Sequence, residues 1–199
     1  MHCIEQDSLS RRRSIYGLGH AASVSDNCLL DTIESCVMHC PTPFNVQSAR
    51  LAVLFKSHHH EFWQMVDKEI AKLTSGDKRS AAKKKIASFA NAYGTILFFE
   101  DKTAIQSLKK QFPLYARNMR LWAQQANGML QYMVWQSLAE NEIGASLQHY
   151  NELIAKELNS WLKLPKSWKI VAQMPFGSIE KEPGSKTFLP LEERVRIFS

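Results

Sequence analysis

The sequence is organised around residues 121–151, which read LWAQQANGMLQYMVWQSLAENEIGASLQHYN. Between Arg120 and Glu140 there are 19 residues without a charge, and their apolar side chains fall on nearly every side of a helix. A helix that is apolar all round is buried. The glutamines and asparagine of the segment would lack partners in lipid, so it predicts a central core helix with a surface suited to a subunit interface, not a membrane span. Gly144 is expected to end this helix.

Length and composition predict a single globular domain over residues 1–199. The chain is 45% hydrophobic and 22% charged, which is ordinary for a globular protein. Its polar N-terminus shows no apolar signal segment, which predicts a cytoplasmic protein with reduced thiols. Cys36 and Cys40 flank His39, but no second pair at zinc-finger spacing follows, so buried thiols are favoured over zinc. The four cysteines are Cys3, Cys28, Cys36 and Cys40.

Positive charge is concentrated in two segments of a chain whose formal net charge is +6. Residues 78–85 place lysines on the outer side of an expected helix and have no interleaved aromatics to stack on bases. A solvated face is therefore favoured over nucleic-acid binding. The second segment, RRRS at residues 11–14, differs because three guanidinium groups beside a hydroxyl suit a phosphate.

Apolar periodicity predicts a chain of mixed helices and strands. Helices are expected at residues 2–10, 25–40, 62–72, 80–90, 103–111 and 151–162, and strands at 50–55, 94–99 and 168–174. Ser25 is the expected N-cap of the second helix. Pro175 and Gly177 are expected to break the last strand.

Two motifs have the residue pattern of a ligand site but not the expected surrounding secondary structure. Residues 17–22, GLGHAA, match the dinucleotide pattern Gly-x-Gly-x-x-Ala, which requires a buried strand before the glycines. Residues 8–14 are too polar and basic for such a strand, so a Rossmann site is not favoured. Residues 58–60, HHH, stand at the head of a helix rich in large apolar residues, where incidental histidines are favoured over a metal tract.

A polar loop, PTPFNVQS at residues 41–48, precedes the strand at residues 50–55. Asn45 and Gln47 each offer donor and acceptor atoms, which suits the edge of a heterocycle with alternating C=O and N–H groups. The alternative is an Asx turn at the entrance of the strand.

The C-terminal segment ERVRIF, residues 193–198, alternates as a strand does but has no neighbour in sequence with which to pair. An unpaired strand needs a partner from elsewhere. A second copy of the chain would supply one.

Six segments together resemble the nitroreductase family, and most closely its short branch typified by the yeast fatty-acid-repression-mutant proteins and their bacterial relatives. Each segment alone is a weak signal, but the ordered set is specific and covers essentially the whole chain. The segments are RRSIY (12–16), PTPFNVQS (41–48), YGTILFFED (93–101), QFPLY (111–115), GASLQHYN (144–151) and QMPFG (173–177).

The resemblance implies an α+β fold with a central mixed sheet flanked by helices, in an interlocked homodimer with exchanged C-terminal segments and two FMN sites at the interface. By position, the FMN phosphate would be held by Arg12, Arg13, Ser14, Arg194 and Arg196. The loop that meets the flavin from the other subunit would be Pro41, Thr42, Pro43, Asn45 and Gln47. The segment whose backbone approaches flavin N5 would be Gln148, His149 and Tyr150. Tyr16 stands where larger members have a basic phosphate ligand, and residues 148–150 replace a Pro-x-Glu-Gly type of loop.

The activity that the resemblance implies is that of an NAD(P)H-dependent nitroreductase. Such an enzyme takes hydride from NADH or NADPH onto flavin N5 and reduces nitroaromatic or quinone acceptors in a ping-pong cycle, while the protein orients the ring. His149 is the candidate proton donor, and ring positioning is its alternative role. The rival interpretation is a flavin-binding stress-response or regulatory protein with incidental reductase activity. No metal, nucleic-acid or membrane partner is expected.

Overall fold

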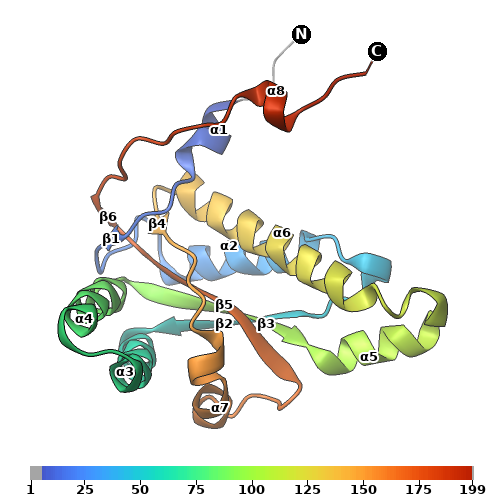
Figure 1. The fold of residues 1–199 in the computed structure, drawn as a ribbon, viewed down its shortest axis with the longest axis horizontal. Helices are drawn as coiled ribbons and strands as arrows, with labels where there is room; N and C mark the ends of the chain where they lie inside the picture. Colours follow the sequence, from blue (N-terminus) through green and yellow to red (C-terminus); the bar gives the residue numbers. More distant parts are fainter. Residues whose placement is uncertain (1–5, 199) are drawn as a thin grey trace.

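A four-stranded sheet forms the centre of the molecule in the computed structural model, which describes residues 6–198 (Figure 1). The strand order is β2 (Ala49–Phe55), β3 (Gly94–Asp101), β5 (Trp168–Gly177) and β4 (Gly144–Ala145). The ladders are antiparallel, and a parallel bridge from Ser14 to Ala145 makes the pairing mixed. This confirms the α+β fold with a mixed sheet flanked by helices.

The other elements surround this sheet, and a two-stranded sheet pairs β1 with β6 at one end. The helices are α1 (Gln6–Arg11), α2 (Asp26–His39), α3 (Lys56–Leu73), α4 (Gly76–Ala90), α5 (Lys102–Gln111), α6 (Met119–Glu140), α7 (Asn151–Trp161) and α8 (Leu191–Arg194). The short elements are β1 (Gly17–Leu18), β6 (Ile179–Lys181) and the 3-10 turns η1 (Pro43–Asn45) and η2 (Pro113–Tyr115).

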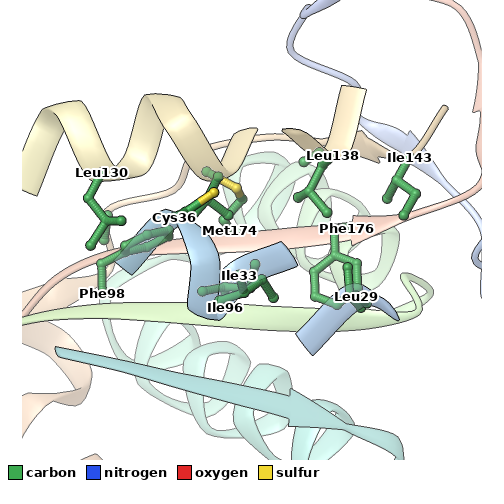
Figure 2. Packing of buried hydrophobic residues seen from close by; sticks show 13 residues of the cluster. Leu29, Ile33, Cys36, Ile96, Phe98, Leu130, Leu138, Ile143, Met174 and Phe176 are labelled. Carbon is green, nitrogen blue, oxygen red and sulfur yellow. The ribbon is translucent and has the colours of Figure 1, made fainter. Parts of the chain in front are cut away.

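Helices cover both faces of the sheet, with α2 and α6 on one side and α3, α4 and α7 on the other (Figure 1). Because successive strand residues point to opposite faces, Ile96 and Phe98 of β3 enter the first core layer, while Leu97 and Phe99 enter the second. Figure 2 shows the first layer, where side chains of α2 and α6 meet those of β3 and β5. Burial on both faces explains the continuous apolar run of β3.

The central helix α6 differs from its prediction at its end and on one face. It ends at Glu140, where the Asn141 side chain donates to the Ser137 carbonyl (2.8 Å), and Gly144 begins β4 instead of ending the helix. The prediction that α6 is buried all round is wrong for a single chain. The side chains of Leu121, Met129 and Tyr132 are between 43% and 53% exposed.

Within residues 6–198, no helix combines the length and hydropathy that a membrane crossing requires.

The prediction that Pro175 and Gly177 break the last strand is also wrong, because β5 continues through both residues. A proline in a strand lacks only the N–H donor. Its carbonyl remains an acceptor, and that of Pro175 receives the backbone N–H of Ser146 (3.3 Å). The strand therefore keeps its pairing with both neighbours through to its end.

The glycines of the GLGHAA motif and Gly177 allow close approach of two backbone segments. A Cβ at Gly177 would lie 2.0 Å from the carbonyl oxygen of Gly19, a contact that would force the backbones apart. Gly19 N–H donates to the Ser178 carbonyl (2.9 Å), and Ser178 N–H donates to the Ala21 carbonyl (2.7 Å). The glycines thus serve packing between the N-terminal segment and the end of β5.

The C-terminal segment leaves the sheet as an extended arm towards the N-terminal end of the chain (Figure 1). Residues 193–198 form no strand within a single chain, since α8 ends at Arg194 and the residues after it pair with no strand among those described. Pairing of this segment with a second copy of the chain stays a prediction. Every residue from 191 to 198 is exposed. The large apolar side chains exposed along the arm are Phe188, Leu189, Leu191, Val195, Ile197 and Phe198.

Three of the four cysteines lie in the described part of the chain, and all three are free thiols. Cys36 is buried, Cys40 is half-buried and Cys28 is exposed, while Cys3 lies outside the described residues. Burial, and to a smaller extent the neighbouring Cys36, raises the pKa of the Cys40 thiol. Among residues 6–198 no group of three or more His, Cys, Asp or Glu side chains is placed to hold a metal ion.

A buried histidine ties α3 to β3 and to the end of α4. His59 Nε2 lies 3.1 Å from the Ala90 carbonyl, and its Nδ1 lies 2.8 Å from Thr95 Oγ1, which also accepts from Trp63 Nε1 (2.9 Å). Since a carbonyl only accepts, Nε2 carries the proton and Nδ1 accepts from the Thr95 hydroxyl. Burial lowers the pKa of His59 to about 4, so the histidine is neutral at neutral pH.

The depressed pKa of His59 predicts acid sensitivity of the fold. An unfolded chain binds this proton near pH 6.5 while the folded chain resists it down to about pH 4, so stability falls as pH falls through this window. Between pH 7 and pH 5 the His59 contribution to the free energy of unfolding should fall by about 2 kcal/mol. Urea titrations of wild type, His59→Gln and the exposed-site control His39→Gln measure this. This fall in the free energy of unfolding between pH 7 and pH 5 should persist in the control and disappear in His59→Gln.

Candidate functional site

A basic cavity of about 500 Å³ opens beside the N-terminal segment, and we call it the arginine pocket. Its walls include the predicted residues Arg12, Arg13 and Ser14. Lys181 and Lys186, from the chain that follows β5, add two more cations, and Glu182 is its acidic residue. Four cations against one carboxylate favour an anionic ligand.

The arginine pocket is held in place by pairing to the sheet. Ser14 forms a parallel bridge with Ala145, and the backbone N–H of the buried Ile15 donates to the Ala145 carbonyl (2.9 Å). One Arg13 nitrogen donates to the Gly184 carbonyl (2.7 Å). The chain is thereby fixed at the arginines by contacts with two other segments, at Ala145 and at Gly184.

Arg12 has a buried donor with no partner. Its guanidinium lies 4.5 Å from the centre of the Trp135 ring, a cation–π contact. Its Nε atom is buried and has no hydrogen-bond partner among the described residues. An unpaired buried donor is costly, so this atom is a candidate donor to a ligand acceptor.

The predicted loop at Gln148, His149 and Tyr150 runs along the outer edge of β5. Gln148 and Gln173 exchange two backbone hydrogen bonds (2.7 and 2.9 Å). The Tyr150 N–H donates to the Gln173 side-chain oxygen (2.7 Å), and the Gln173 side-chain nitrogen donates to Asn151 Oδ1 (2.6 Å). Gln173, which sequence reasoning missed, therefore positions the whole loop.

The backbone N–H of His149 is free where its neighbours are engaged. Within residues 6–198, the amides of Gln148 and Tyr150 both donate to Gln173, whereas that of His149 donates to no group. The His149 side chain is exposed. Tyr150 is half-buried, with its ring edge-on to Trp63 at 6.0 Å, and burial raises its pKa. The loop can thus offer one main-chain donor to a ligand.

Turns shape the loop that precedes β2, in addition to the start of that strand. The predicted residues of this loop are Pro41, Thr42, Pro43, Asn45 and Gln47. The Thr42 hydroxyl accepts from the Gln47 N–H (3.1 Å), and the Asn45 N–H donates to the Thr42 carbonyl (3.1 Å). Phe44, Asn45 and Gln47 have φ of 51°, 52° and 46°, a conformation uncommon for residues with a Cβ. Asn45 and Gln47 are exposed, so their amide groups are presented outward.

An aromatic cluster holds this strained loop against the start of α6. The Phe44 ring stacks on Phe112 with centroids 4.3 Å apart, and it lies 5.8 Å from Tyr115 and 6.4 Å from Trp122. Stacked pairs of this kind add to the energy of burial. A strained backbone persists only where its surroundings over-determine it, and here the aromatic rings do so.

One chain does not bring all the predicted site residues together. The arginine pocket lies beside Trp135 and the Pro41 loop beside Trp122, which are thirteen residues apart on α6, or about 20 Å. Arg194 and Arg196 are exposed and do not line the arginine pocket. Ser14 and the loop at residues 148–150 do adjoin one another through Ala145.

The family model for nitroreductases matches residues 9–178, a range that contains Arg12, Arg13 and Ser14 of the arginine pocket, the Pro41 loop and the β5 edge. The chain belongs to the nitroreductase family. Two Saccharomyces cerevisiae relatives agree with the predicted branch. HBN1 is 32% identical over 194 residues, covering 96% of this chain and 95% of the relative, and nitroreductase FRM2 is 28% identical, covering 92% of each.

Solved nitroreductases share the fold over nearly the whole chain. Nitroreductase CinD from Lactococcus lactis, in complex with chloramphenicol, superimposes with a TM-score of 0.89 at 38% identity, covering 97% of this chain and 98% of that one. A nitroreductase from Saccharomyces cerevisiae superimposes with a TM-score of 0.75 at 27% identity, covering 86% and 93%.

The Gln173 contacts predict a loss of loop order in this nitroreductase when the amide is removed. Gln173→Leu retains the shape but leaves the half-buried N–H of Tyr150 without its acceptor, which should cost about 1–3 kcal/mol. Hydrogen exchange at the Tyr150 and Asn151 amides should accelerate, while exchange in α2 should stay at the wild-type rate. Gln125→Leu, on the exposed side of α6, is the control. Unchanged Tyr150 protection would contradict a positioning role for Gln173.

Proposed function

We propose that this nitroreductase is an FMN-dependent oxidoreductase that takes hydride from NADH or NADPH and reduces nitroaromatic or quinone-type acceptors, as a homodimer with two shared sites. The observation that carries the proposal is the unpartnered buried Nε of Arg12 in a pocket with four cations. Complexes of the 38% identical CinD with chloramphenicol, 4-nitrophenol and nicotinic acid support the substrate classes.

The arginine pocket fits the phosphate of FMN. Arg12 offers its unpaired Nε, Arg13 has nitrogens beyond the one bound to Gly184, and Ser14 adds a hydroxyl. Guanidinium forks bind phosphate with charge-assisted hydrogen bonds. A solved family member from Desulfovibrio desulfuricans, which shares the fold at 19% identity and a TM-score of 0.70, is in complex with FMN. FMN is accordingly the cofactor that the residues suit.

The loop at Gln148, His149 and Tyr150 fits the ring of the same cofactor. When bound, FMN supplies a ring that accepts hydride and passes electrons to a second substrate. The free N–H of His149 is the main-chain donor that the loop can direct at this ring, since Gln173 engages the amides on both sides. The exposed His149 side chain orients the ring and screens it from water, and the main chain, not the imidazole, supplies the hydrogen bond.

A homodimer would bring together the arginine pocket of one chain and the Pro41 loop of the other, which are separated along α6 within one chain. The Pro41 loop and the arginine pocket contact points on α6 that are about 20 Å apart along the helix, so Asn45 and Gln47 serve a flavin held by the other subunit. The exposed apolar residues of α6 and of the C-terminal arm provide surface for such an interface. The arm then brings Arg194 and Arg196 to the partner's phosphate site.

The experiment that tests the proposal is an anaerobic reductive titration. The purified protein should be yellow, bleach on addition of NADH or NADPH, and recover its colour with a nitroaromatic at each turnover. A colourless protein that takes up no FMN would overturn the proposal. Bleaching without reoxidation by nitroaromatics or quinones would indicate a flavin-binding regulatory protein.

Loss of the Arg12 charge should weaken FMN binding. Arg12→Gln removes a charge-assisted hydrogen bond, so FMN binding should weaken by about 1.5–3 kcal/mol, which raises the dissociation constant roughly 10- to 150-fold. Fluorescence titration of the apoprotein measures it. Arg11→Gln is the matched control, because Arg11 is adjacent and exposed but does not line the pocket. Equal affinity in the two variants would remove Arg12 from the phosphate site.

Deletion of residues 191–199 should weaken the dimer and flavin binding together. If Val195, Ile197 and Phe198 are buried on the partner, each contributes on the order of 1.5–3 kcal/mol to association. Size-exclusion chromatography at several protein concentrations, with flavin absorbance followed across the peak, detects both losses. A truncated protein that stays dimeric and yellow, or a monomer that keeps its flavin, would contradict the shared site.

A further inference from the structure

A second cavity, of about 540 Å³, lies among α5, α6, the start of α7 and β5, and we call it the lysine pocket. Four cationic side chains line it, namely Lys102, Lys109, Arg120 and Lys169. Within residues 8–198, none of these four side chains forms an ion pair or a hydrogen bond. Unpaired cations gathered around a concave surface raise the local concentration of anions.

Two carboxylates also line the lysine pocket, and one of them is already engaged. Glu100 is 6% exposed, and its two oxygens accept from the Ser48 hydroxyl (2.8 Å) and the Asn127 amide (2.8 Å). Burial raises the pKa of Glu100. Glu152 is exposed at the start of α7. Four cations against these two carboxylates leave the pocket positive.

The lysine pocket adjoins the loop at residues 148–150. Asn151 and Glu152, which line it, directly follow Tyr150 in the chain. Asn151 is fixed in place, because its Nδ2 donates to the Val171 carbonyl (2.6 Å) and its Oδ1 accepts from Gln173. The arginine pocket adjoins the other end of the same segment, where Ser14 pairs with Ala145. The segment from residue 145 to residue 151 is thus flanked by two separate cationic pockets.

We propose that the lysine pocket binds the phosphates of the nicotinamide dinucleotide. This inference rests on the proposed function, in which the dihydronicotinamide ring meets the flavin beside His149. In a dinucleotide the phosphates lie a short distance from the reacting ring. The protein cations that bind these phosphates must therefore lie near the loop but outside the FMN phosphate site. The Arg120 fork and the three lysines suit a pyrophosphate.

The test neutralises two cations of the pocket in the FMN-loaded protein. Lys109→Gln combined with Arg120→Gln should raise KM for NADH and NADPH by about tenfold or more, as loss of charge-assisted contacts implies, with kcat kept. Binding of ADP-ribose to the oxidised protein, measured by calorimetry, should weaken equally. Reduction by an N-benzyl dihydronicotinamide, which has no phosphate, should proceed at the wild-type rate. Lys78→Gln combined with Lys84→Gln, on the exposed side of α4, is the matched control.

The possible results separate this inference from the proposed function. A KM and an ADP-ribose affinity equal to those of the control would overturn the assignment. Weakened FMN binding in the double variant would also overturn it, because the pocket would then hold the flavin phosphate. Equal slowing with the phosphate-free donor would indicate a distorted loop and would likewise count against it. Failure of the wild-type protein to bind FMN defeats the proposed function instead, whereas ADP-ribose binding still reports on the pocket.

Discussion

The outer edge of β5 is the constraint on which the candidate site depends. One edge of this strand pairs with β3 along its length, and the other edge receives the segment from β4 to Asn151. Pro175, Gln173 and Val171 each accept or exchange hydrogen bonds there. Ser14 then pairs with Ala145 on the far side of that segment, so both cationic pockets are positioned relative to a single strand. A shift in its register would move all of them together.

Much of the fold could be predicted because the local signals agree with the tertiary structure. The apolar run of β3 is buried on both faces, and Ser25 accepts from the Cys28 N–H to begin α2 as its sequence position suggests. The failures have local causes that only the three-dimensional structure shows. Pro175 remains in the sheet because its carbonyl is the group that is used. Gly144 does not end α6 because Asn141 has already capped it.

The site residues were predicted from ordered motifs, and the residues that were missed are those to which the motifs assigned no role. Arg12, Arg13 and Ser14 share a pocket, and the 148–150 loop lies beside them as expected. Gln173 and Lys181 reach the site by strand pairing across long stretches of sequence, which spacing along the chain does not reveal. The alternation at residues 193–198 predicted a strand, but alternation without a neighbouring ladder carries no pairing energy, and α8 forms there.

The distance between the two halves of the site along α6 has a genetic consequence. In the proposed homodimer, each flavin is served by the arginines of one chain and by the Pro41 loop of the other. A hybrid of one chain with a defective arginine pocket and one with a defective Pro41 loop would gather both lesions in a single site and leave the second site whole. Two inactive alleles of this kind would complement each other when expressed together, whereas two alleles damaged in the same half would not.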